Sequence, residues 1–177
     1  MIFVYIIGGL VLLFALINII GLMLPEKYEG AMTAQFDATS QDVWDALSDY
    51  RRHPMTAGMM KSIEESEGDS QSQPQWIEAM GDSDRITITM TESQEPSHMV
   101  REMQSASVPM TSRWVYELAA NDDGCRVTVA AVTTIRRGTW HVPIFRLMMK
   151  LTNGVRAGIK AHLNQVFKTM GQKPQYE

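Results

Sequence analysis

The spacing of apolar residues divides the chain into regions of different periodicity. Residues 2–24 are almost wholly apolar and carry no charge. Within residues 28–137, short segments alternate apolar and polar positions, which is typical of strands with one buried face. Residues 143–170 return to apolar spacings of three and four, which predict an amphipathic helix. The pattern therefore predicts an apolar N-terminal segment, a sheet and a C-terminal helix.

The N-terminal apolar segment is long enough to cross a membrane. As a helix, the 23 residues from Ile2 to Leu24 would reach roughly 34 Å, against a hydrocarbon core of about 30 Å. A cleaved signal peptide is the alternative, but it would need a basic start, a shorter apolar core and a small-x-small cleavage site, and none is present. We therefore predict an uncleaved, single-pass transmembrane helix over residues 1–25.

The orientation of this helix is only weakly indicated. The charges of Glu26, Lys27 and Glu29 nearly cancel, so the excess of basic residues that marks the cytoplasmic side is absent. The single cysteine, Cys125, cannot form an intramolecular disulfide, and nothing else points to an oxidising compartment. We expect the rest of the chain to lie on the cytoplasmic side.

The central region predicts seven strands and one short helix. A first strand over residues 28–38 is followed by a helix in which Thr39 and Asp42 resemble a capping box. This helix should end before Pro54, which disfavours helical geometry in the residue before it. Turn-rich links separate six further segments and favour antiparallel pairing. These strands are predicted over residues 59–68, 74–81, 84–93, 98–106, 112–120 and 125–137.

The C-terminal region predicts one long helix from about Pro143 to Met170. Proline suits a first helical turn because its missing N–H is not needed there. Gly154 and Gly158 lower helix propensity, and would permit a bend or a close approach to the backbone. The apolar stripe comprises Met148, Leu151, Val155, Ile159, Leu163 (or His162), Val166 and Met170.

This order of elements resembles the SRPBCC superfamily of START-like helix-grip proteins, including those labelled polyketide cyclase/dehydrase. The resemblance lies in "FDATSQDVWDALSDYRRHP", "SRWVYELAANDDGCRVTV" and "PIFRLMMKL", in that order. It implies an α+β domain over residues 28–171, with a curved antiparallel sheet of about seven strands wrapped around a long C-terminal helix. It also implies a cavity between sheet and helix. The N-terminal transmembrane helix departs from the typical soluble member.

In such a fold, the inward positions of the strands and of the helix would line the cavity. The strand period of two selects them on the sheet. The fourteen methionines of the chain would make a soft, adaptable lining for a lipid or another hydrophobic small molecule. The same residues could instead fill a solid core. The predicted ligand-binding residues are Trp76, Ile86, Ile88, Met90, Met99, Arg101, Met103, Trp114, Tyr116, Val129, Leu151, Val155 and Ile159.

Arg101 is the most informative of these residues. Arg101 lies between Met99 and Met103 on one face of the strand, so its guanidinium would be unpaired in apolar surroundings unless an acidic group paired with it. Glu78 or the acidic group of a ligand could do so. The alternative is a different strand register, in which Arg101 faces water beside Glu102.

Signals of catalysis are poor. The histidines show no metal-site spacing, and no phosphate-binding or nucleophile motif occurs, so no catalytic residue, metal or cofactor is predicted. Tyr116, Glu78, Arg101 and His141 could still act as acids or bases on a bound substrate. A cyclase/dehydratase-type enzyme is therefore one alternative, and a structural or interaction module is another.

The charge of the chain is strongly divided. Residues 1–123 carry 7 basic and 19 acidic residues, whereas residues 124–177 carry 9 basic residues and 1 acidic one. A basic segment of this kind suits an anionic partner. Nucleic acid is not expected, because no recognition module is present and a membrane anchor argues against it. The predicted membrane-surface residues are Arg136, Arg137, Trp140, Phe145 and Arg146.

The alternative for this segment is a solvated basic helix with Trp140 packed in the core. The leading hypothesis is a membrane-anchored domain that binds, and could transfer, a lipid or other hydrophobic molecule.

Overall fold

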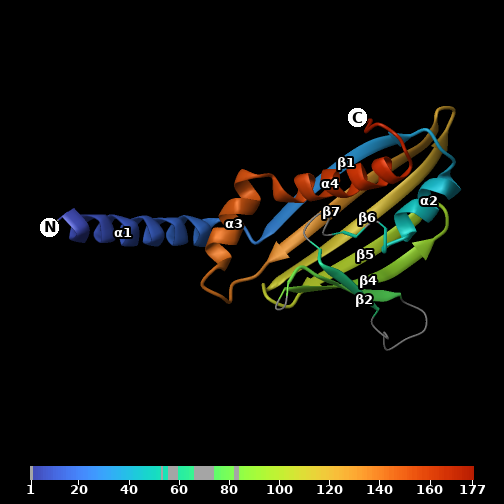
Figure 1. Cartoon of the computed structure of the whole chain (residues 1–177). Coiled ribbons are helices and arrows are strands. Elements are labelled where there is room, and N and C mark those ends of the chain that lie inside the picture. Colours follow the sequence, from blue (N-terminus) through green and yellow to red (C-terminus); the bar gives the residue numbers. More distant parts are fainter. Residues whose placement is uncertain (1, 53, 56–59, 66–73, 82–83) are drawn as a thin grey trace.

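The computed structural model describes residues 2–52, 54–55, 60–65, 74–81 and 84–177, and shows an α+β fold (Figure 1). The predicted class is confirmed. In chain order, the elements are α1 (Ile2–Met23), β1 (Lys27–Phe36), α2 (Ser40–Ser48), β2 (Ser62–Glu65), β3 (Gln75–Ala79), β4 (Arg85–Gln94), β5 (His98–Ser105), β6 (Met110–Asn121), β7 (Gly124–Ile135), α3 (Val142–Leu151) and α4 (Gly154–Thr169).

The strands form one antiparallel, seven-stranded sheet in the order β1-β7-β6-β5-β4-β3-β2. Strands β2 to β7 pair with their neighbours along the chain, as the short links predicted, and β1 pairs with β7. Part of the predicted strand 59–68 lies outside the described residues. In Figure 1, α4 lies along one face of the sheet and α2 covers it near one end.

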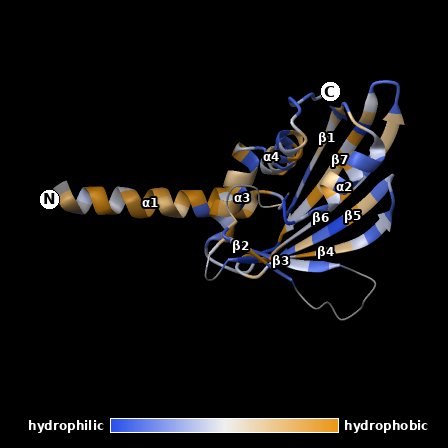
Figure 2. Cartoon of the chain, turned by 45° about the vertical axis from the view of Figure 1, so that its right-hand side comes forward, coloured by the Kyte–Doolittle hydropathy of each residue, from blue (hydrophilic) through white to orange (hydrophobic). Residues whose placement is uncertain are grey.

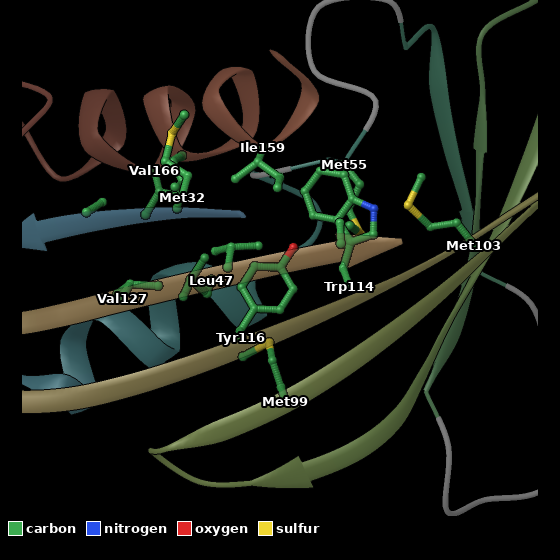
Figure 3. Close-up of a cluster of buried hydrophobic side chains, with 14 of the residues drawn as sticks. Met32, Leu47, Met55, Met99, Met103, Trp114, Tyr116, Val127, Ile159 and Val166 are labelled. Atoms are coloured by element: carbon green, nitrogen blue, oxygen red, sulfur yellow. The ribbon is translucent and has the colours of Figure 1, made fainter. Parts of the chain in front are cut away.

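The core lies between this face and the helices (Figure 3). Alternate residues of β6 and β7 are buried, as the strand period predicted. The rings of Phe36 and Phe167 stack with centroids 4.0 Å apart, joining β1 to α4. Gly30 permits this approach, because a Cβ atom there would lie 3.1 Å from the backbone nitrogen of Arg156.

Helix α2 begins as predicted. Thr39 is the N-cap, and its hydroxyl accepts a hydrogen bond from the backbone N–H of Asp42. The hydroxyl in turn donates to the Asp42 carboxylate at 2.7 Å. These bonds satisfy a backbone donor that the helix itself leaves free.

The predicted long C-terminal helix is divided into two helices, with the break beside Gly154, where the sequence permitted a bend. Helix α3 ends at Leu151, and Asn153 adopts a left-handed conformation with φ of 49° before α4 starts. Asparagine tolerates this region better than most residues. The break turns α3 away from the axis of α4 (Figure 1). Met148 and Leu151, expected on the buried stripe, are therefore exposed.

Helix α1 projects away from the rest of the protein, and most of its residues are hydrophobic (Figure 2). It is long and apolar enough to cross a membrane, and its described side chains are nearly all exposed. Its last turns contact α3. A Cβ atom at Gly21 would lie only 2.2 Å from the carbonyl oxygen of Pro143, so glycine is what lets the two backbones meet.

Candidate ligand-binding site

The candidate site is the concave interior of the sheet, beneath α4. Most of the predicted lining residues point inward here and are buried. Met90 is only half-buried, and it lies where the pairing of β4 with β5 becomes irregular, between Met90 and Glu92. The inward position expected for Leu151 is wrong, since the helix break carries it to the surface. The buried members are Trp76, Ile86, Ile88, Met99, Arg101, Met103, Trp114, Tyr116, Val129, Val155 and Ile159.

Arg101 lies inside the protein and is fully buried. The alternative in which it faces water is therefore wrong. Its Nη2 donates to the carbonyl oxygen of Leu47 at 2.5 Å. The guanidinium carbon lies 5.5 Å from the ring of Trp76 and 5.3 Å from that of Tyr116, so aromatic faces flank the cation. Among the described residues, Nε and Nη1 have no hydrogen-bond partner.

Glu78 lies in the same interior, one inward position along β3 from Trp76. Its carboxylate accepts a hydrogen bond from the backbone N–H of Met55 at 2.8 Å and one from the indole N–H of Trp76 at 3.1 Å. The interior therefore holds both an acidic and a basic side chain.

Tyr116 supplies a further polar group to the interior. Its hydroxyl is buried and has no hydrogen-bond partner among the described residues. Burial raises the pKa of Tyr116 to about 12, although the nearby cation of Arg101 acts to lower it. The phenol is therefore protonated at neutral pH and remains a hydrogen-bond donor.

His162 also belongs to this interior, although the sequence offered it only as an alternative to Leu163 on the helical stripe and not as a ligand-binding residue. Its buried ring lies 6.0 Å from the rings of Trp114 and Tyr116. The helical stripe placed either His162 or Leu163 inward, and both are buried. The spacing of apolar residues alone could not show that a histidine shares the buried face.

Trp114 is held by a polar chain that sequence reasoning also missed. Its indole N–H donates to the Ser112 hydroxyl at 2.9 Å, and that hydroxyl lies 2.8 Å from the hydroxyl of Thr133. The pair joins neighbouring positions on β6 and β7. It fixes the direction of the indole ring above the sheet.

The suggested role of His141 in an acid–base set is not supported by its position. His141 precedes α3, its Nε2 lies 3.1 Å from the Thr139 hydroxyl, and its ring contacts Trp140. It is thus part of the loop between β7 and α3 and not of the polar interior. Of the four histidines of the chain, His53 lies outside the described residues. Among the residues that the structure describes, no cluster could hold a metal ion.

The predicted membrane-surface residues differ in their exposure to solvent. Arg136, Arg137 and Trp140 are exposed, so the alternative with Trp140 in the core is wrong. Phe145 is half-buried against the core. Arg146 is fully buried, so its prediction as a surface residue is also wrong.

Arg146 connects three parts of the chain. Its guanidinium donates to the carbonyl oxygen of Ile135 at 2.6 Å and to that of Leu24 at 3.4 Å, and it pairs with Glu26 at 3.0 Å. The hydroxyl of Tyr28 donates to the carbonyl oxygen of Arg146. The arginine turns inward because the backbone at the end of α1 and of β7 offers it these acceptors.

Pockets lined by described residues open at the edges and on the outer face of the sheet. A pocket of about 970 Å³ lies beside Thr39 and the β6–β7 turn, and one of about 540 Å³ lies over outward threonines such as Thr87 and Thr111. A third, of about 420 Å³, lies at the α3–α4 corner beside Lys27. None of these is enclosed between sheet and α4, so the ligand cavity there stays a prediction.

The curved seven-stranded sheet with a helix across it, and a buried polar cluster between them, defines a helix-grip protein. The sequence matches the family "Polyketide cyclase / dehydrase and lipid transport" over residues 29–170, and the chain belongs to this family. The resemblance inferred from the sequence is thus confirmed. No curated protein matches the chain.

Solved structures share the fold at low sequence identity. The Zhui aromatase/cyclase from Streptomyces sp. R1128 is 15% identical, with a TM-score of 0.59 over 81% of this chain and 92% of that one. A conserved protein from Geobacillus kaustophilus is 14% identical, with a TM-score of 0.59 over 84% and 99%. The di-domain ARO/CYC BexL from the BE-7585A pathway is 10% identical, with a TM-score of 0.53 over 80% and 50%.

Proposed function

We propose that this protein binds an apolar small molecule bearing a carboxylate or carbonyl oxygen, between the sheet and α4, while α1 anchors it in a membrane. The observation that carries the proposal is Arg101, a fully buried arginine with two donor nitrogens that have no partner among the described residues. The family description, which includes lipid transport, supports a ligand of this class.

The available groups select the chemistry of the ligand. Nε and Nη1 of Arg101 can only donate, and the protonated hydroxyl of Tyr116 can donate as well. Donors buried in the same apolar interior favour an acceptor such as a carboxylate. Apolar side chains such as Met99 and Ile159 surround these donors, so the rest of the ligand should be hydrocarbon.

The same donors give binding a driving force. A buried donor without a partner costs about 1–3 kcal/mol, and a buried guanidinium is also a poorly solvated charge. A ligand oxygen that accepts from Arg101 would remove both penalties. The polar end of the ligand would then determine orientation, and burial of its hydrocarbon part would supply affinity.

A membrane location fits this kind of ligand. Molecules with long hydrocarbon parts partition into bilayers, and α1 would hold the domain beside that supply. The position of the domain on the cytoplasmic side, and transfer of the ligand to or from the bilayer, remain predictions of the same proposal. Alkaline carbonate extraction of cell membranes tests the anchor: the full chain should stay in the membrane pellet, and its release would contradict the anchor.

The ligand proposal is tested by comparing two arginine variants. Decanoic acid and decanol serve as matched probes with and without a carboxylate, and the full chain is held in lipid nanodiscs. For the wild type, we expect decanoic acid to raise the thermal unfolding temperature more than decanol does. Arg101→Met should abolish this difference, because the carboxylate of decanoic acid then no longer meets the guanidinium.

Arg113→Met is the control, since Arg113 is an exposed arginine that pairs with Glu92 at 2.7 Å on the outer face. This variant should keep the preference for the acid. An equal response to both probes in the wild type, or an unchanged preference in Arg101→Met, would contradict the proposal. No response to any apolar probe would favour a module with a filled core.

A cyclase/dehydratase-type enzyme is the second candidate. The observation that favours it is the burial of Glu78, Arg101, Tyr116 and His162 in the same interior, since such groups can exchange or hold protons. The matched family includes polyketide cyclases and dehydrases. Incubation with a linear poly-β-ketone should then yield a ring, through a new carbon–carbon bond and loss of water. Tyr116→Phe should slow this reaction, and absence of turnover in the wild type would reject the candidate.

A further inference from the structure

Helix α3 and the loop before it lie across the end of α1. We call residues 136–151 the collar. The contact between Gly21 and Pro143, together with the bonds of Arg146 to Leu24 and Glu26, ties the collar to the point where α1 ends. In Figures 1 and 2, α3 stands beside the last turns of α1 and crosses their direction. If α1 crosses a bilayer, the collar lies at the level of the bilayer surface.

The collar exposes large apolar side chains that the fold leaves uncovered. Trp140 is 72% exposed, Met148 57% and Leu151 75%. The end of α1 is similarly exposed, with Met23 at 82%. The apolar surface of α1 therefore continues onto the collar. Tryptophan is also a residue type that concentrates at membrane–water interfaces.

Cations accompany these apolar side chains. Arg136, Arg137 and Lys150 are exposed, and the collar contains no acidic residue. The neighbouring acid Glu26 is already paired with the buried Arg146 at 3.0 Å and lies 3.9 Å from Arg137. Exposed apolar groups mixed with basic ones match the interface of an anionic membrane better than they match water.

We propose that the collar rests on the surface of the membrane that α1 spans. Trp140, Met148 and Leu151 enter the boundary between headgroups and acyl chains, while Arg136, Arg137 and Lys150 bind anionic phospholipid headgroups. This inference rests on the proposed anchoring by α1. It goes further, because it fixes how the domain is oriented on the bilayer.

The orientation also places a groove at the membrane surface. The pocket of about 420 Å³ at the α3–α4 corner is lined by Lys27 and Lys150 on its rim and by Tyr28 and Val155 on its inner side. Tyr28 and Val155 belong to the core cluster beneath α4. Glu29 also lines the pocket. The collar would thus place the pocket at the α3–α4 corner, which leads towards the core, next to the lipid headgroups.

Spin labels on single cysteines test the inference in the full chain. The native Cys125 is buried, so it should not react with the label. Leu151→Cys and Met148→Cys each place a label on the collar. Val132→Cys, on the outer face of the sheet, is the control. The protein is placed in nanodiscs of phosphatidylcholine and phosphatidylglycerol. Collisions with oxygen, which concentrates in lipid, are compared with collisions with a water-soluble nickel chelate.

We expect the collar labels to collide severalfold more with oxygen, relative to the nickel chelate, than the Val132→Cys label does. A label at Leu12→Cys reports on α1 itself. If that label lies in lipid while both collar labels behave like the one at position 132, the inference is overturned and the anchor stands. If the label at position 12 is in water, the anchoring proposal has failed.

A charge comparison tests the headgroup contacts. Replacing Arg136, Arg137 and Lys150 together with glutamine should move the Leu151→Cys label towards water in anionic nanodiscs. The matched control replaces Arg156, Lys160 and Lys168, exposed cations of α4, a helix that leads away from α1 (Figure 1). That control should leave the label in place. An equal effect of both triple variants, or of neither, would contradict binding of anionic headgroups by the collar.

Discussion

Two buried arginines show why a residue type must be judged by its partners. Arg146 has carbonyl and carboxylate acceptors from three segments, so its burial joins those segments. Arg101 has one carbonyl acceptor and two donor nitrogens without partners among the described residues. Buried donors are nearly always satisfied in native proteins. The unpartnered donors of Arg101 support the ligand that we propose, whereas the satisfied Arg146 has a structural role.

Tyr116 provides a residue-scale prediction. Tyr116→Phe removes a buried hydroxyl with no partner among the described residues, so we expect the ligand-free chain to become more stable by up to about 1 kcal/mol. Tyr176→Phe is the comparison, because the Tyr176 hydroxyl donates to Asn164 Oδ1 at 2.6 Å. That variant should lose about 1 kcal/mol. Thermal unfolding in detergent measures both, and a large loss in Tyr116→Phe would mean that its hydroxyl is already satisfied.

At the scale of elements, the outer face of the sheet is held by cross-strand charge pairs. Arg113 on β6 pairs with Glu92 on β4 at 2.7 Å, and His98 on β5 lies between Glu92 and Glu117. The distance from His98 Nδ1 to Glu117 is 2.7 Å. Opposite charges on neighbouring strands support pairing. This network belongs to the side of the sheet away from the candidate site.

The His98 network predicts a pH dependence of stability. The hydrogen bond to Glu117 raises the pKa of His98, and the charges of Glu117 and Glu92 act in the same direction. A raised pKa means that the stabilisation is complete below the ordinary histidine value of about 6.5 and is lost as the pH rises through the raised value. The free energy of unfolding, measured with denaturant, should therefore be higher for the wild type than for His98→Gln. This difference should grow as the pH falls from about 8 to about 6.

Glu117→Gln should remove most of this pH dependence as well, because it deletes the strongest partner of His98. If the difference in unfolding free energy between the wild type and His98→Gln stays constant over this pH range, the protonated ring does not have this role.

At the scale of the whole molecule, the joint between α1 and the collar determines how the domain is placed relative to α1. Gly21 lets the backbone of α1 touch Pro143, and Arg146 bonds across the same joint. An anchor on a flexible linker would leave the domain free to rotate. If α1 crosses a bilayer, as we propose, a packed joint instead presents one face of the domain to it.

Gly21 provides the whole-molecule prediction. In Gly21→Ala, the added methyl carbon would lie 2.2 Å from the carbonyl oxygen of Pro143. This distance is far too short for a non-bonded contact, so α1 and α3 must move apart. We expect a loss of roughly 1–3 kcal/mol, as for other overpacked contacts, seen as a lower unfolding temperature in detergent. Gly9→Ala is the control, because a Cβ atom there meets nothing within 4 Å. Equal stability of the two variants would show that the α1–α3 contact contributes nothing.

The sequence by itself determined the class of fold, the strands and the inward residues of the sheet. These follow from local periodicity, because a strand exposes alternate side chains to one face whatever its neighbours are. It also indicated Trp76, Glu78 and Arg101 as inward positions, and all three are buried.

Only the tertiary structure decided what those inward residues meet. The break at Asn153, the burial of Arg146, the exposure of Trp140 and the presence of His162 beside Tyr116 depend on contacts between segments far apart in the chain. Periodicity records which face of an element is apolar. It does not record which carbonyl, ring or helix end lies opposite, and those partners distinguish the structural Arg146 from Arg101, for which we propose a ligand.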